Sequence, residues 1–68
     1  MLPSTLELQQ ALEYVRSYEA DSEWSILGEP DPWAGNIWCL NMPYDQAIIL
    51  DAYCELMFHT RVRSVTTL

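Results

Sequence analysis

The chain contains no lysine, and its three arginines face ten acidic residues. The resulting net charge of −7 repels nucleic acid and anionic membranes and favours basic partners. Residues 1–55 hold all ten acids and one arginine, a charge of −9, whereas residues 56–68 hold two arginines, a charge of +2. Because phosphate binding normally needs a basic patch, the sequence argues against direct binding of DNA or RNA.

The motifs of common enzymes are also missing. The two cysteines, Cys39 and Cys54, have the spacing of neither a CxxC motif nor a zinc site, and no phosphate-binding glycine loop or nucleophile elbow is present. Cys54 and His59 lie about 140° apart on a helix, so they do not face each other as a nucleophile and base. We therefore expect no enzymatic activity and no metal or cofactor, and we interpret both cysteines as buried, reduced thiols.

No apolar run is long enough to cross a bilayer. The longest, residues 47–58, spans about 12 residues and contains Asp51 and Glu55, whereas a membrane-spanning helix needs about 20. Residues 1–10 lack the basic start and apolar run of a signal peptide. The sequence thus predicts a cytoplasmic protein without membrane contact.

The 68 residues predict a single small domain spanning 1–68. Half of the residues are hydrophobic, so the composition allows a core. The core of so small a domain seldom supplies more than about 3–5 kcal/mol, and such domains often depend on oligomerisation.

Two helices are predicted. Ser4 and Glu7 form a capping box, which predicts an amphipathic helix over residues 5–20. The most hydrophobic stretch lacks strand-like alternation and predicts a long apolar helix over residues 43–61, starting at Pro43.

The second predicted helix has more apolar surface than one neighbour can cover. Asp51, Glu55 and His59 share a polar wedge roughly 80° wide, which leaves an apolar arc of about 240°. The side predicted to face the core contains Ala47, Leu50, Cys54, Met57 and Phe58. The other side contains Ile49, Tyr53 and Leu56, and we expect a second copy of the chain, as a homodimer, or a different protein to cover it.

Between the helices, residues 21–41 contain two short aromatic and β-branched runs around a loop rich in proline and glycine, which predicts a hairpin or an ordered loop. The tail, residues 62–68, is rich in β-branched residues and is expected to add a strand, pair with another subunit or fray. The predicted fold class is therefore mainly α, a small α+β domain that dimerises through its second helix.

Two groups of residues are candidate sites. Asp51, Glu55 and His59 have a spacing that allows a metal or a tuned base, but a solvated face explains it better because no second ligand cluster exists. The segment 19–31 combines five acids with tryptophan, which suits binding to a basic, partly apolar cleft. For Trp24 and Trp38 we favour a place in the core. The predicted partner-binding residues are Trp33, Glu29, Asp31, Glu23 and Trp24.

In size, acidity and lack of catalytic motifs, the chain resembles the small proteins with which bacteriophages and mobile elements block host factors, including anti-CRISPR and anti-activator proteins. The resemblance implies a stoichiometric inhibitor in the host cytoplasm that docks on a larger protein with a basic or apolar groove. Two alternatives remain open: a structural, adaptor or antitoxin-like subunit, and a nucleic-acid mimic whose acids fill a basic channel.

Overall fold

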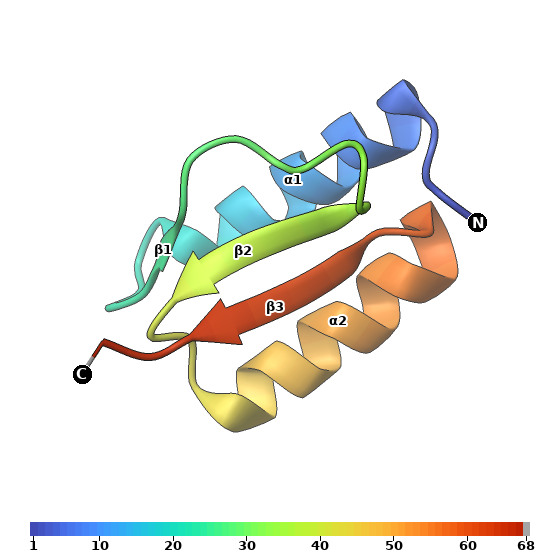
Figure 1. Ribbon diagram of the computed structural model, residues 1–68. Coiled ribbons are helices and arrows are strands. Elements are labelled where there is room, and N and C mark those ends of the chain that lie inside the picture. Colours follow the sequence, from blue (N-terminus) through green and yellow to red (C-terminus); the bar gives the residue numbers. More distant parts are fainter. Residues whose placement is uncertain (68) are drawn as a thin grey trace.

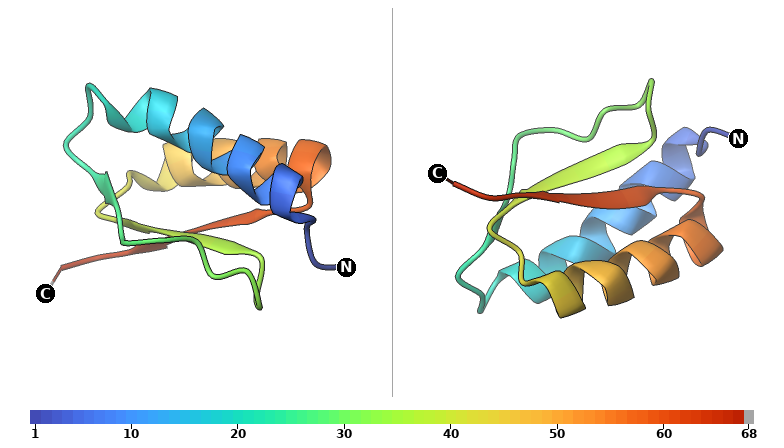
Figure 2. Two further views of the ribbon diagram at one scale, coloured as in Figure 1. Left: turned by 90° about the horizontal axis from the view of Figure 1, so that it is seen from above. Right: turned by 60° about the horizontal axis from the view of Figure 1, so that its bottom comes forward.

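The computed structural model describes residues 1–67, which fold into two helices and three strands in the order α1–β1–β2–α2–β3 (Figure 1). The strands form one mixed sheet in the order β1–β2–β3. Both helices lie on the same face of this sheet, so the domain has two layers and neither helix covers the other face (Figure 2). Leu68, the last residue of the predicted tail, lies outside the described residues.

Helix α1, Thr5–Glu19, begins at the predicted capping box. The Ser4 N–H donates to Glu7 Oε1 at 2.9 Å, and the Glu7 N–H donates to Ser4 Oγ at 3.1 Å, which confirms the predicted start. Its apolar stripe packs into the core between the helices and the sheet. That core contains Ala11, Leu12, Val15, Trp24, Ile37, Cys39, Met42, Leu50, Cys54 and Val62.

Strands β1, Ser25–Ile26, and β2, Asn36–Leu40, form an antiparallel hairpin around an ordered loop. Alternation along β2 buries Ile37 and Cys39 under the helices and turns Trp38 to the open face, where 39% of it is exposed. The predicted core position of Trp38 is therefore wrong, because a strand sends successive side chains to opposite faces.

Helix α2, Tyr44–Phe58, has 15 residues, the same length as α1. It ends because His59 adopts a left-handed conformation with φ of 55° and its N–H bonds to the Glu55 carbonyl at 3.1 Å. The prediction of a helix over residues 43–61 is therefore too long.

The residues beyond this end form strand β3, Arg61–Val65, which pairs with β2 in parallel and in register Ile37↔Val62. Parallel neighbours need a crossover connection, and α2 provides it. Of the three outcomes expected for the tail, an added strand is the one observed. The prediction of a mainly helical fold is wrong, because the sheet makes up one of the two layers.

The long apolar second helix and the homodimer through it are also incorrect. Leu50 and Cys54 of α2 are buried in the chain's own core, and Phe58 packs against it. The polar wedge is largely exposed, with 55% of the Glu55 side chain and 51% of the His59 side chain accessible, and Asp51 and Glu55 also bind Arg61 of β3. Helix α2 has only 15 residues, and it contacts the chain's own core and sheet through these side chains. It therefore gives no basis for the predicted dimer.

The contact between α2 and β3 is centred on Asp51. Arg61 Nε and Nη2 each donate to a different oxygen of the Asp51 carboxylate at 2.9 Å, and the Val62 N–H donates to Oδ1 at 2.8 Å. Glu55 adds a second carboxylate on the same guanidinium, at 2.8 Å from Nε. Asp51 is the more buried of the two, with 23% of its side chain exposed against 55% for Glu55.

We expect Asp51→Ala to lower the free energy of unfolding by about 2 kcal/mol, because it removes a bidentate ion pair and a backbone hydrogen bond that are partly shielded from water. The matched control, Glu55→Ala, removes an exposed partner of the same arginine and should cost less than about 0.5 kcal/mol. Urea denaturation of both variants measures the difference. Equal losses would contradict the central role of Asp51.

Candidate protein-interaction surfaces

The loop between β1 and β2 is held by hydrogen bonds to Asp31. Its carbonyl accepts from the Gly35 N–H at 2.8 Å, and its carboxylate accepts from the Trp33 N–H at 3.0 Å. Gly35 has φ of 66°, and a Cβ there would lie 2.7 Å from Pro3 Cδ, so the turn requires glycine. The ordered backbone presents the Trp33 side chain to solvent with 86% of it exposed.

The structure separates the predicted partner-binding residues into two groups. Glu23, Glu29 and Trp33 are exposed, whereas Asp31 is half-buried and its carboxylate is used inside the loop. Trp24 is only 4% exposed, and its Nε1–H donates to Gln46 Oε1 at 2.9 Å. A partner cannot reach Trp24 in this conformation, and its burial matches the core position favoured from the sequence.

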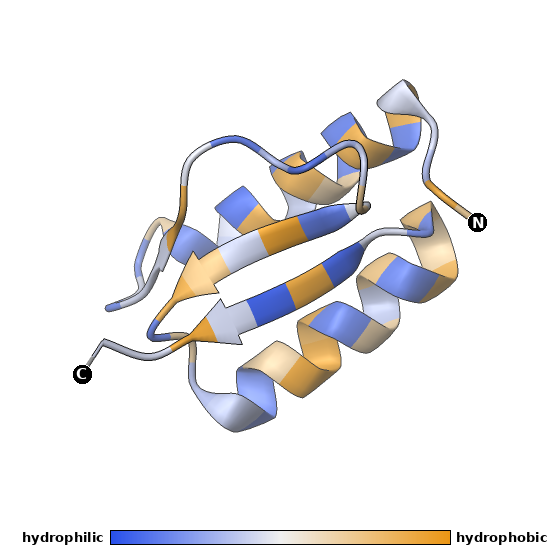
Figure 3. Cartoon of the chain, viewed as in Figure 1, coloured by the Kyte–Doolittle hydropathy of each residue, from blue (hydrophilic) through white to orange (hydrophobic). Residues whose placement is uncertain are grey.

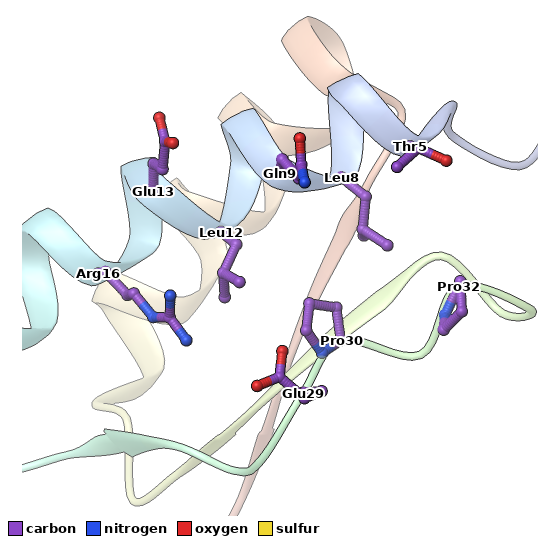
Figure 4. Close-up of a pocket in the computed structure, with 9 residues that line it drawn as sticks. All are labelled: Thr5, Leu8, Gln9, Leu12, Glu13, Arg16, Glu29, Pro30 and Pro32. Carbon is purple, nitrogen blue, oxygen red and sulfur yellow. The ribbon is translucent and has the colours of Figure 1, made fainter.

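A groove of about 470 Å³ runs between α1 and the loop (Figure 4). Leu8 and Leu12 of α1 face Pro30 across it, and Arg16 and Glu29 lie toward the same end. Sequence reasoning missed this groove, because it depends on how the loop folds back on the helix. Its lining residues are Thr5, Leu8, Gln9, Leu12, Glu13, Arg16, Glu29, Pro30 and Pro32.

The second exposed apolar surface is the α2 outer face, defined by Ile49, Tyr53, Leu56 and Met57. Ile49 is 68% exposed and Leu56 is 78% exposed. Met57 is 51% exposed, so its predicted place on the core side is wrong. Tyr53 is more covered, because its ring stacks on Tyr14 of α1 with a centroid distance of 4.3 Å. Figure 3 shows hydrophobic and hydrophilic bands alternating along α2.

Helix α1 keeps the α2 outer face and the loop apart. One side of α1, with Leu8 and Leu12, lines the groove, while Glu7 and Tyr14 contact α2. The Glu7 carboxylate binds His59 Nδ1 at 2.7 Å. The structure therefore does not bring the two predicted sets of partner-binding residues together.

Charge is divided between the sheet and the rest of the domain. The three strands contain Arg61 and Arg63 and no acid, a charge of +2. The other described residues contain all ten acids and Arg16, a charge of −9. The helices and loops thus form an acidic exterior, and because Arg61 is paired with Asp51 and Glu55, Arg63 is the strand arginine that forms no ion pair with residues 1–67.

Two carboxylates are stabilised in their charged form. Burial would raise the pKa of Asp51, but hydrogen bonds from Arg61 and the Val62 N–H outweigh it, so the pKa of Asp51 lies below its usual range. The hydrogen bond from the Ser4 N–H, followed by that with His59, lowers the pKa of Glu7.

The three residues of the polar wedge do not converge on one site. Within residues 1–67 no cluster of three His, Cys, Asp or Glu side chains could hold a metal ion. Asp51 and Glu55 bind Arg61, whereas His59 binds Glu7, so the three residues of the polar wedge diverge. Over the same residues, no helix has the length and apolar character needed to cross a membrane.

A comparison of the chain with family models, curated proteins and solved structures finds no match. The function must therefore be inferred from the side chains and their arrangement.

The pKa shifts predict how stability changes in acid. A carboxyl with a lowered folded-state pKa contributes stability that is present above its unfolded pKa, about 3.9 for Asp, and is lost as pH falls through the folded value. The free-energy difference between wild type and Asp51→Asn should be constant from about pH 7 to 5 and shrink below about pH 4. Urea denaturation across this range tests it, and a difference that persists undiminished at pH 2 would contradict it.

The cysteines should be unreactive in the folded protein. Burial raises the pKa of Cys39 to about 12 and that of Cys54 to about 11, which keeps both as thiols. At about pH 8 a thiol-specific disulfide reagent should label the native chain at least about a hundredfold more slowly than the urea-unfolded chain. Rapid labelling of either residue without urea would show that the thiol is accessible.

Proposed function

We propose that this protein is a non-enzymatic, acidic protein-binding module that docks on a larger protein and blocks a functional surface of it stoichiometrically. The observation that carries the proposal is the exposure of the α2 outer face. Ile49, Tyr53, Leu56 and Met57 stand at positions i, i+4, i+7 and i+8 and form one stripe along the helix. This is the spacing with which a helix inserts anchors into a hydrophobic groove.

The charge around the stripe specifies the partner further. Asp45 lies one turn before Ile49 and is exposed, and the chain as a whole carries −7. Acidic surroundings accelerate encounter with a basic partner and reject acidic ones, while the apolar side chains supply affinity. The proposed target surface is therefore an apolar groove with a basic rim.

Trp33 is the proposed second anchor. An exposed tryptophan on a loop fixed by internal hydrogen bonds has little conformational entropy to lose on binding, and tryptophan is enriched among interface hot spots. Glu29, in the same loop, is also exposed and adds an acidic residue to it. Trp33 and the α2 outer face lie on different flanks of α1, so they are proposed as separate contacts.

The test is capture of a partner from a bacterial lysate, followed by calorimetry and activity assays with the purified partner. Ile49→Glu and Leu56→Glu should each weaken binding by about 30-fold or more, because each places a charge in the apolar contact. Gln9→Glu adds the same charge on the flank of α1 that faces the groove, and it should bind as wild type. Melting curves establish that all three variants are folded.

Stoichiometric inhibition requires that the partner lose activity as the protein reaches an equimolar amount. A partner that binds with full activity would instead indicate the adaptor alternative. A loss of affinity of about 1,000-fold between about 50 and 200 mM salt would indicate nucleic-acid mimicry. Equal binding by wild type, Ile49→Glu and Leu56→Glu would contradict the proposed contact.

A further inference from the structure

One edge of the sheet is only partly closed. Strand β3 pairs with β2 on one side, where the Arg61 N–H donates to the Gly35 carbonyl at 2.8 Å. The Val62 N–H points the other way and donates to Asp51. Because alternate residues of a strand direct their backbone groups to opposite edges, the N–H and C=O of Ser64 also point away from β2.

The Asp51 carboxylate closes this edge only at Val62. Charged side chains at a sheet edge block pairing with further strands, and Asp51 does so at the start of β3. At the other end, the Val65 carbonyl accepts from the Asn41 N–H at 2.7 Å, and the Thr67 N–H donates to Asn41 Oδ1 at 2.9 Å. These bonds hold the chain extended beyond Ser64 and leave a short stretch of edge around that residue.

A groove of about 320 Å³ accompanies this stretch of edge. Tyr44, Ala47 and Ile48 of α2 line one side, and β3 lines the other. Ile48 and Tyr44 are exposed and apolar, so the groove offers a place for an apolar side chain beside backbone hydrogen-bonding groups. Strand addition uses this combination of an open edge and side-chain pockets.

The charge of the groove comes from Arg63. Asp51 also lines the groove, but its carboxylate is already bound to Arg61 and the Val62 N–H. Arg63 is exposed, lies beside Trp38 across the sheet and forms no ion pair with any residue from 1 to 67. The groove therefore combines one available cation with an apolar wall.

We propose that the outer edge of β3 binds a short extended peptide segment in which an apolar residue is flanked by acidic residues. When the apolar residue of the peptide pairs opposite Ser64, its side chain faces α2 and contacts Ile48 and Ala47. Its two neighbours face the open side of the sheet, where Arg63 lies. This binding site does not rest on the proposed function, because it shares no residue with the α2 outer face.

A second copy of the chain fits this edge less well than such a peptide. Strand β3 contains no acidic residue, so a second copy paired antiparallel through Ser64 would set Val65, and no carboxylate, opposite Arg63. An acidic segment instead supplies carboxylates to Arg63. Charge complementarity thus selects the occupant.

The probe is the capped peptide acetyl-Thr-Asp-Leu-Asp-Thr-amide, titrated into the isotope-labelled full chain and followed by amide chemical shifts. The Ser64 amide should shift saturably, with a dissociation constant of roughly 1 mM. The same peptide methylated at its leucine nitrogen cannot donate to the Ser64 carbonyl and should not bind. Ile48→Glu should abolish binding, whereas Ile49→Glu, on the α2 outer face, should leave it unchanged.

Charge reversal provides the matched control. Arg63→Glu should weaken binding of the acidic peptide about tenfold and improve binding of the corresponding Lys-Leu-Lys peptide. Arg16→Glu makes the same change at a distant exposed arginine, and it should change the binding of neither peptide. The proposal is overturned if the Ser64 amide shift does not change on addition of the peptide, or if the methylated peptide binds equally. It is also overturned if Arg63→Glu and Arg16→Glu have the same effect, or if raising the protein concentration without peptide changes the Ser64 amide shift.

Discussion

The fold depends on the contact of Asp51 with Arg61 and the Val62 N–H. Strand β3 lies beside β2 only because α2 carries the chain back across the sheet, and Asp51 fastens the middle of that helix to the start of the strand. With Asp51 and Glu55 turned toward β3 and Leu50 and Cys54 turned toward the core, the remaining arc of α2 must face solvent. The exposure of Ile49 and Leu56 thus follows from the ion pair together with the burial of Leu50 and Cys54.

The same contact shapes the edge of the sheet. Asp51 uses the backbone donor of Val62 and the charge of Arg61, and it leaves Ser64 and Arg63 for other contacts. The domain therefore has acidic helices with an exposed apolar face, and beside a groove at the strand edge it has Arg63, which forms no ion pair with residues 1–67. A partner that suits one of these surfaces is electrostatically unsuited to the other, so the two proposed contacts select different partners.

The three tryptophans show how far local sequence predicts a site. Trp33 stands between turn-forming residues, and the structure exposes its side chain in a loop ordered by Asp31. Trp24 and Trp38 both occur in short apolar runs that look alike in the sequence. Only the tertiary structure separates them: Trp24, just before β1, is buried and bonds to Gln46 of α2, whereas the pairing of β2 between β1 and β3 puts Trp38 on the open face.

The sequence alone determined the start of α1, through the Ser4–Glu7 capping box, and the acidic, lysine-free exterior, because capping and composition are local or additive properties. A helical wheel of the second helix also separated Leu50 and Cys54, which are buried, from Ile49 and Leu56, which are exposed, but it placed the exposed Met57 on the core side. Only the tertiary structure decided that the helix ends at Phe58, that residues 61–65 form a strand, and that the polar wedge faces β3. These features follow from parallel pairing between segments distant in the chain, which no local periodicity records.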